Sequence, residues 1–195
     1  MESMTFYNFH KLTDSKWLNL FHVEGFRKNK KFSWEYVSRK KKPLSSIGEP
    51  DAVVIIPVLK DKDGKDKLVI TKEFRIPIGG YEYGFPAGLI DGEESLEDTV
   101  KRELKEETGL ELLEIVEATS SPVYSSAGMT DECTTMAICR VEGEISDEFQ
   151  EETEDIETFL YDIDDIKELL KSDKKIGAKA WGLLWHFKQI NKIEI

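Results

Sequence analysis

The alternation of apolar and polar residues predicts strands along the first part of the chain. Residues 6–39 consist of short apolar and aromatic runs, such as WLNLFHVEGF and KFSWEYVSR, that alternate with charged residues, as half-buried strands do. Residues 40–51 (KKKPLSSIGEPD) have the composition of a linker. The run AVVIIPVL predicts a strand buried on both faces, and Asp63-Gly64 predicts a hairpin turn into the strand LVITKEF. We therefore expect a strand-rich section over residues 1–45 and a larger domain over residues 46–195.

The second half of the chain mixes strand and helix patterns. A turn at residues 78–81 is expected to lead into a short strand at residues 83–87. Further strands are expected at residues 112–119, 133–142 and 157–163, with an acidic loop at 143–154, and helices at 164–171 and 176–191. In the last helix, Trp181, Leu184 and Phe187 are expected on related faces.

The helix expected between Ser95, a good N-cap, and Gly109, a stop signal, carries acidic residues against its apolar stripe. On a helical wheel the stripe is formed by Leu96, Val100 and Leu104, and the acidic residues on or beside its edge are Glu103, Glu106 and Glu107. Arg102 can pair with Glu106 at spacing i,i+4, but one arginine cannot neutralise three carboxylates. Two readings remain open: a solvated helix shoulder, or oxygen ligands for Mg²⁺ or Mn²⁺.

Charge and composition narrow the range of partners. The net charge of -12 argues against nucleic acid and against anionic membrane surfaces. The basic clusters RKNKK and RKKK are expected to be solvated, or to attract an anionic substrate. The N-terminus lacks the pattern of a signal peptide, and no stretch approaches the roughly 20 apolar residues of a membrane span. These features favour a cytoplasmic protein that has neither nucleic acid nor membrane as a partner.

The residues around the acidic helix match a long motif. Gly88, Glu94 after five intervening residues, and RELKEETGL at residues 102–110 agree with every fixed position of the Nudix box. The likeness extends to EFRIPIGGYEYGFPAGLID, KWLNL and WEYVSR. Over most of residues 17–162, the chain resembles Nudix hydrolases of the ADP-ribose/ADP-sugar pyrophosphatase subfamily.

This resemblance implies an α/β (α+β) fold, a Nudix-type α/β/α sandwich with a mixed sheet. The N-terminal section, residues 1–45, would contribute to dimerisation and to substrate binding, and residues 46–195 would form the Nudix hydrolase domain. In similar enzymes this β-rich section is often exchanged across a homodimer, so the resemblance also implies a homodimer.

The resemblance further implies a set of metal-binding and catalytic residues. The ligands of Mg²⁺ or Mn²⁺ would be the carboxylates of Glu103, Glu106, Glu107 and Glu154 and the carbonyl oxygen of Ala87. Arg102 would orient Glu106, which would share a metal. The general base would come from the loop EETEDIE, where Glu152 is the expected base, although Glu151, Glu152 and Glu154 are hard to tell apart. The alternative for this loop is a flexible acidic surface segment.

The expected substrate contacts come from other parts of the chain. Trp34 would stack on adenine, Glu35 would accept a hydrogen bond from its amino group, and Arg39 would bind phosphate or ribose. Trp17 matches a second stacking tryptophan that the other subunit supplies in similar dimers. Arg75 matches an arginine that binds phosphate or ribose. The alternatives are tryptophans in the core and an ordinary arginine at a strand end.

The implied reaction is the Mg²⁺-dependent hydrolysis of the pyrophosphate bond of a nucleoside diphosphate sugar, with ADP-ribose giving AMP and ribose 5-phosphate. Ala127, in the segment SSAGMTDE, occupies a position where ADP-ribose pyrophosphatases carry a proline, which leaves other sugar nucleotides such as UDP-glucose or GDP-mannose open. A third reading is a Nudix module that senses ADP-ribose without cleaving it. Such modules usually lose carboxylates of the box, whereas this chain has them all.

Overall fold

The computed structural model describes residues 4–43 and 48–195, and this part of the chain divides into two compact units. The first contains the chain up to Asp51 together with Ser121–Thr134, and the second contains Ala52–Ser120 and Thr135–Ile195. The expected boundary at residue 45 lies outside the described residues. No helix in the described residues is long and apolar enough to cross a membrane.

The first unit is built on an antiparallel sheet, in agreement with the alternating pattern of its sequence. Its strands, in the order β1-β2-β3, are β1 (Thr5–Lys11), β2 (Asn19–Arg27) and β3 (Lys30–Ser38). Every second residue of β2 from Asn19 to Gly25 is buried, including Phe21 and Val23. The segment 121–134 joins this unit through a hydrogen bond of 2.9 Å from the backbone nitrogen of Val37 to the carbonyl oxygen of Met129.

The second unit has a mixed sheet at its centre. Its strands are β4 (Ala52–Lys60), β5 (Asp66–Arg75), β6 (Gly80–Gly84), β7 (Ala87–Leu89), β8 (Glu111–Ala118), β10 (Cys133–Glu142), β11 (Ile156–Tyr161) and β12 (Lys175–Ile176). The main path runs β12-β6-β5-β4-β10-β8, while β11 pairs with β5 and β7 with β4. The short β9 (Val123–Tyr124), which belongs to the first unit, pairs with Cys133 and Thr134 at the start of β10. The sheet is mixed because β12 is parallel to β6, whereas β4, β5 and β6 are antiparallel in turn.

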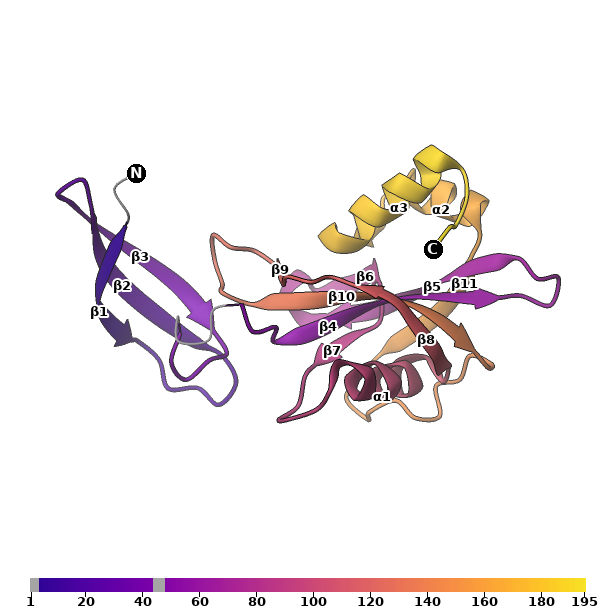
Figure 1. The fold of residues 1–195 in the computed structure, drawn as a ribbon, viewed down its shortest axis with the longest axis horizontal. Coiled ribbons are helices and arrows are strands. Elements are labelled where there is room, and N and C mark those ends of the chain that lie inside the picture. Colours follow the sequence, from indigo (N-terminus) through magenta and orange to yellow (C-terminus); the bar gives the residue numbers. More distant parts are fainter. Residues whose placement is uncertain (1–3, 44–47) are drawn as a thin grey trace. The chain divides into compact units, whose positions relative to one another are not determined.

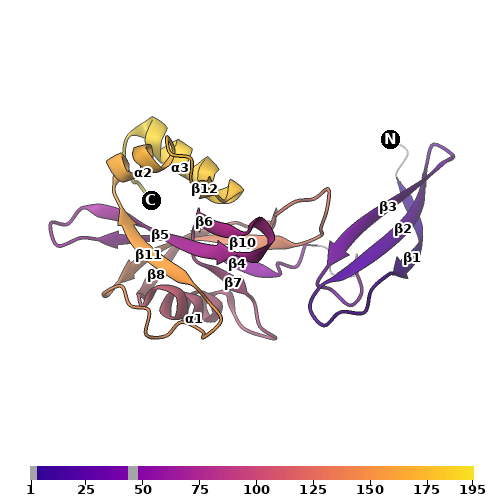
Figure 2. The ribbon, with the colours of Figure 1, turned by 180° about the vertical axis from the view of Figure 1, so that it is seen from behind.

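Helices cover both faces of this sheet. Figure 1 shows α1 (Leu96–Thr108) on one side and α2 (Ile163–Leu169) with α3 (Ala178–Ile190) on the other, and Figure 2 shows the same layers from behind. The expected α/β/α sandwich is therefore confirmed.

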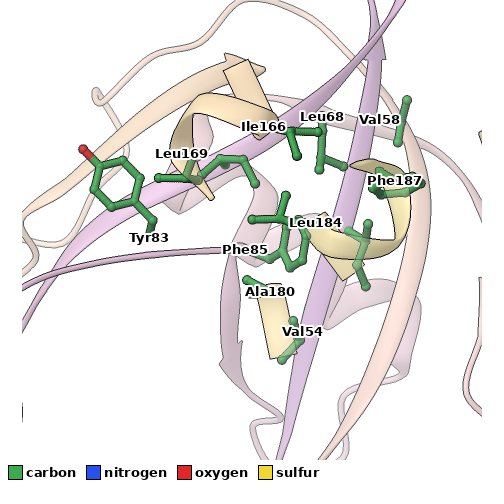
Figure 3. Packing of buried hydrophobic residues seen from close by; sticks show 12 residues of the cluster. Val54, Val58, Leu68, Tyr83, Phe85, Ile166, Leu169, Ala180, Leu184 and Phe187 are labelled. Atoms are coloured by element: carbon green, nitrogen blue, oxygen red, sulfur yellow. The ribbon is translucent and has the colours of Figure 1, made fainter. Parts of the chain in front are cut away.

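Strand β4 lies at the centre of this sandwich, since residues 53–59 are all buried. Its even-numbered residues, Val54, Ile56 and Val58, pack with α2 and α3, where Leu184 and Phe187 of α3 join them (Figure 3). Its odd-numbered residues Val53, Ile55 and Leu59 pack with Val100 and Leu104 of α1. Successive side chains of a strand point to opposite faces, so one apolar run supplies both cores. The expectation of a strand buried on both faces is confirmed.

Several element boundaries differ from the expectation. The strand expected at residues 83–87 is two strands, because Phe85 and Pro86 separate β6 from β7 and proline has no N–H for a ladder. The turn expected at residues 78–81 is a short 3₁₀ helix (Ile76–Ile78), after which Gly79 has a positive φ of 56°. The last helix begins at Ala178 rather than Ile176, because Ile176 belongs to β12 and pairs there with Tyr83 of β6.

The placement of Trp181 with Leu184 and Phe187 is wrong. Leu184 and Phe187 are buried, whereas Trp181 is 49% exposed and stacks on Trp185 with ring centroids 6.5 Å apart. The pair lies one turn apart on the outer face of α3, where i and i+4 side chains are neighbours.

The packing of α3 on the sheet predicts that Leu184→Ala strongly destabilises the protein. Leu184 is fully buried between α3 and β4, so truncation leaves a cavity that costs about 2–5 kcal/mol of unfolding free energy. Urea unfolding followed by circular dichroism measures this loss. The matched control is Leu113→Ala on β8, where the side chain is 56% exposed and the cost should stay below about 1 kcal/mol. Equal losses in the two variants would contradict this packing.

Candidate active site

Helix α1 begins and ends where the sequence predicted. The side chain of Ser95 accepts a hydrogen bond of 3.1 Å from the backbone nitrogen of Asp98, which caps the first turn. Gly109 has a φ of 75° and its N–H donates to the carbonyl oxygen of Lys105, which closes the last turn. These two caps fix where the helix begins and ends, and the packing of Val100 and Leu104 against the sheet decides which side chains face it.

Arg102 joins the acidic side chains on this face of α1. Its guanidinium donates to both carboxylate oxygens of Glu94, at 3.1 and 3.0 Å, and to the carbonyl oxygen of Leu89 at 3.0 Å. It also contacts Glu103 at 2.6 Å and Glu106 at 3.1 Å, so the expected i,i+4 pair is present. The hydrogen bond from Arg102 lowers the pKa of Glu94 to about 2. The arginine thus holds three carboxylates close together.

Glu103 and Glu107 are buried, at 7% and 4% exposure, as the position of Glu107 inside the apolar stripe required. Glu107 lies 3.3 Å from the backbone nitrogen of Ala87. Burial raises the pKa of both carboxyl groups, and that of Glu107 lies well above its usual value because Glu103 and Glu73 add negative charge. The negative charge of these two buried carboxylates is thus offset only in part, by Arg102 beside Glu103.

Gly88 makes room for one of these carboxylates. A Cβ atom at this position would overlap the carboxylate of Glu103, so the residue must be glycine for the side chain to keep its place. Because Gly88 lies on β7 next to Ala87, this approach of the strand to α1 places the backbone of residue 87 beside Glu107.

The acidic loop after β10 is attached to the C-terminal end of α1. The amide of Gln150 donates to the carbonyl oxygens of Glu107, at 3.4 Å, and Ile156, at 2.9 Å. In this loop Glu152 is exposed, whereas Glu154 is half-buried, and its Oε2 atom is buried with no hydrogen-bond partner among the described residues. Burial raises the pKa of Glu154, and its charge in turn raises that of Glu103 and Glu107. Glu154 therefore lies close enough for its charge to act on the carboxylates of α1, and Glu152 as the base stays a prediction.

Sequence reasoning missed one further member of this group, Glu73 on β5. Arg75 contacts it at 2.5 Å, and burial raises its pKa. The signal was present in the period of two along LVITKEFR, which places Glu73 and Arg75 on the face of β5 that carries Val69 toward α1.

The carboxylate and carbonyl oxygens around α1 are the atoms that a divalent cation would need as ligands. Among the described residues, no group of three or more acidic, histidine or cysteine side chains already has the arrangement of a metal site. The chemistry of the groups nevertheless fits one, because buried carboxylates with raised pKa values and an unpartnered carboxylate oxygen call for positive charge. Carboxylate and carbonyl oxygens are also the donors that Mg²⁺ and Mn²⁺ prefer.

The expected base-stacking residues belong to the first unit, and neither is in a core. Trp34 is 55% exposed, its indole N–H donates to the carbonyl oxygen of Gly128 at 3.2 Å, and it lines a cavity of about 970 Å³. Phe32, Tyr36, Tyr124 and Ala127 line the same cavity. Trp17 is 66% exposed, with the ammonium of Lys16 4.1 Å from its ring centre.

The polar residues expected beside these tryptophans have partners of their own. Glu35 follows Trp34 on β3 and therefore points to the other face of the strand, where it lies 3.6 Å from the imidazole of His22. Arg39 donates to Glu132 at 2.9 Å. The substrate contacts of Glu35 and Arg39 stay predictions.

Comparison with known proteins agrees with these features. The family described as NUDIX domain matches residues 49–180. The chain is 35% identical over 136 residues to an ADP-ribose pyrophosphatase of Saccharomyces cerevisiae, which covers 69% of this chain and 56% of that protein. It is 41% identical over 88 residues to an ADP-sugar pyrophosphatase of Mus musculus, covering 45% and 39%. The chain thus spans about half the length of the curated relatives it matches.

The fold itself has a solved counterpart. A crystal structure of an ADP compounds hydrolase superposes with a TM-score of 0.71 at 18% identity, and the match covers 99% of this chain and 98% of that one. At this identity the match shows a shared fold.

The buried charge of Glu107 predicts an unusual pH dependence of stability. Since its pKa is raised above 4.5 on folding, the folded protein binds more protons than the unfolded chain, and stability falls as the pH rises from about 5 toward 8. In EDTA, Glu107→Gln should therefore raise the melting temperature by about 3 °C or more at pH 8 and by less at pH 5.

Differential scanning fluorimetry at the two pH values measures this effect. The control is Glu97→Gln on the same helix, where the side chain is 62% exposed, and it should show no such difference between the two values. A Glu107→Gln variant that is less stable than the unaltered protein at both pH values would contradict the argument.

Proposed function

Because the chain belongs to the NUDIX domain family, we propose that it hydrolyses the pyrophosphate bond of a nucleoside diphosphate sugar, with ADP-ribose giving AMP and ribose 5-phosphate. The observation that carries the proposal is the pair of buried carboxylates on α1, of which Glu103 packs against Gly88, the glycine that opens the Nudix box, and Glu107 lies beside the backbone nitrogen of Ala87. The printed names of the yeast and mouse relatives support the substrate class.

The proposal includes a divalent cation, Mg²⁺ or Mn²⁺. Glu103, Glu106, Glu107 and Glu154 and the carbonyl oxygen of Ala87 would hold it. When bound, the cation supplies positive charge that neutralises the phosphates and favours attack by water. The burial of Glu103 and Glu107 supports this assignment, since buried carboxylates are paired or coordinate metals.

The other residues of the second unit would orient the reacting groups. Arg102 donates to Glu103 and Glu106 at once, which fixes the rotamers of both carboxylates. Glu152 is the proposed general base, with Glu154 as the alternative that lies nearer the cluster. Arg75 would bind a phosphate or ribose oxygen, for which its guanidinium must share its contact with Glu73.

The first unit would bind the nucleoside. The exposure of Trp34 and Trp17 supports their role as stacking platforms for adenine, with Glu35 and Arg39 as polar contacts. Because Trp17 would serve the site of the other subunit, the proposal includes a homodimer, acting in the cytoplasm. Ala127 lies on the same cavity as Trp34, and this observation keeps a sugar nucleotide other than ADP-ribose as the second candidate.

The substrate is tested by product analysis with mass spectrometry. The purified protein is incubated with ADP-ribose, ADP-glucose, UDP-glucose and GDP-mannose, each with Mg²⁺ and with EDTA. AMP and ribose 5-phosphate should appear fastest, and only with metal. Faster cleavage of another sugar nucleotide would transfer the proposal to that substrate, and binding of ADP-ribose without cleavage would support a sensor.

Two glutamine variants separate the site from the rest of the helix in this assay. Glu107→Gln should lower turnover at least about 100-fold, because it removes a carboxylate ligand, and the exposed Glu97→Gln should leave it unchanged. Turnover of Glu107→Gln at the unaltered rate would refute the metal assignment.

The stacking role of Trp34 predicts an effect on binding rather than on chemistry. Loss of one stacked ring costs about 1–3 kcal/mol, so Trp34→Ala should raise KM for ADP-ribose about tenfold or more while kcat changes less than about twofold. Steady-state kinetics measures both constants. Trp181→Ala, which removes an exposed tryptophan of α3, is the control and should leave KM unchanged. An unchanged KM in Trp34→Ala would exclude the stacking role.

A further inference from the structure

A hydrogen bond between β6 and the acidic loop has no role in the function described so far. The phenol of Tyr81 donates to the Oδ2 atom of Asp155 at 2.6 Å. Asp155 directly follows Glu154, so the bond lies next to the half-buried carboxylate whose charge acts on Glu103 and Glu107. We propose that Tyr81 is a positioning residue, which holds the acidic loop so that Glu154 and Glu152 face the carboxylates of α1. This inference rests on the proposed function.

Asp155 is fixed by its backbone as well as by its side chain. The backbone nitrogen of Phe74 on β5 donates to its carbonyl oxygen at 3.1 Å. The side chain of Asp155 then reaches Tyr81 on the neighbouring strand β6, where Tyr81 is the cross-strand partner of Phe74. Two strands therefore define the position at which the loop returns to the sheet.

The loop is attached at its other end too. Gln150 bonds the carbonyl oxygens of Glu107 and Ile156, so only the short segment between Gln150 and Asp155 is left to bend. Within it the backbone nitrogen of Glu154 donates to the carbonyl oxygen of Glu151 at 3.0 Å, which forms a turn. Release of the Asp155 side chain would remove one of the two bonds that hold this end of the turn, and so loosen the two carboxylates that the turn carries.

The ring of Tyr81 is held independently of its hydroxyl. Phe74 meets it edge to face with ring centroids 5.4 Å apart, and the ammonium of Lys72 lies 4.4 Å from the ring centre. The bond to Asp155 raises the pKa of Tyr81, so the phenol keeps the proton that it donates. Replacement by phenylalanine thus removes the hydrogen bond and leaves the packing of the ring in place.

The test is a double-mutant cycle measured by steady-state kinetics with the best substrate and Mg²⁺. Tyr81→Phe and Asp155→Ala should each lower kcat about fivefold with KM changed less than about twofold, and the double variant should be no slower than either. Asp155→Asn keeps an acceptor oxygen and should restore most of kcat. Tyr161→Phe is the control and should match the unaltered enzyme. Tyr161 packs with the hydrophobic core beneath α2 and α3, on the face of the sheet opposite to α1.

Hydrogen exchange of residues 150–155 gives a second readout, which needs no activity. Faster exchange in Tyr81→Phe, with the melting temperature and the rest of the sheet unchanged, is the expected result. Unchanged kcat in Tyr81→Phe, or effects that add in the double variant, would overturn the positioning role alone. A wild-type enzyme that cleaves no substrate would overturn the proposed function and the positioning role with it.

Discussion

The burial of carboxylates against the apolar stripe of α1 is the constraint on which the rest of the site depends. Glu107 occupies a position where a core helix would ordinarily carry an apolar residue, and a charge there is costly unless it is compensated. Three neighbouring residues accommodate these carboxylates or reduce the cost of their burial. Gly88 has no side chain, Ala87 turns its N–H toward Glu107, and the guanidinium of Arg102 lies beside Glu103. Under the proposed function, the negative charge that remains uncompensated would attract the divalent cation.

The sequence was most informative where the signal was local. Capping residues and a period of 3.6 placed α1 and put Glu107 in its buried stripe, and a single apolar run predicted the two buried faces of β4. Features that depend on pairing between distant segments could not be found in this way. Ile176 pairs with Tyr83 of β6 instead of starting a helix, and Trp181 stacks on Trp185 instead of packing with Leu184 and Phe187. Glu73 was overlooked because its significance arises only when β5 lies beside α1.

The candidate residues fall into two sets that belong to different units. The carboxylates, Arg102 and Arg75 lie in the second unit, on the sheet, on α1 and in the acidic loop. The two expected stacking residues, Trp17 and Trp34, lie in the first unit, together with the loop that contains Ala127. Under the proposed function, the second unit would determine which bond is broken and the first would determine which nucleotide is bound. Changes in the loop of Ala127 could then alter substrate preference without disturbing the carboxylate cluster.

The pairing of β11 with β5 has a consequence for how the protein reaches its native state. Both strands are needed to complete the middle of the sheet, yet the loops, α1 and β10 separate them along the chain. During synthesis, β5 can pair with β4 and β6 early but must keep part of its backbone open until residues 156–161 leave the ribosome. Over that interval an unpaired edge, flanked by strongly apolar β4, is exposed to other nascent chains. The acidic residues of α1 and of the acidic loop before β11 would repel other copies of this negatively charged chain while the sheet is still incomplete.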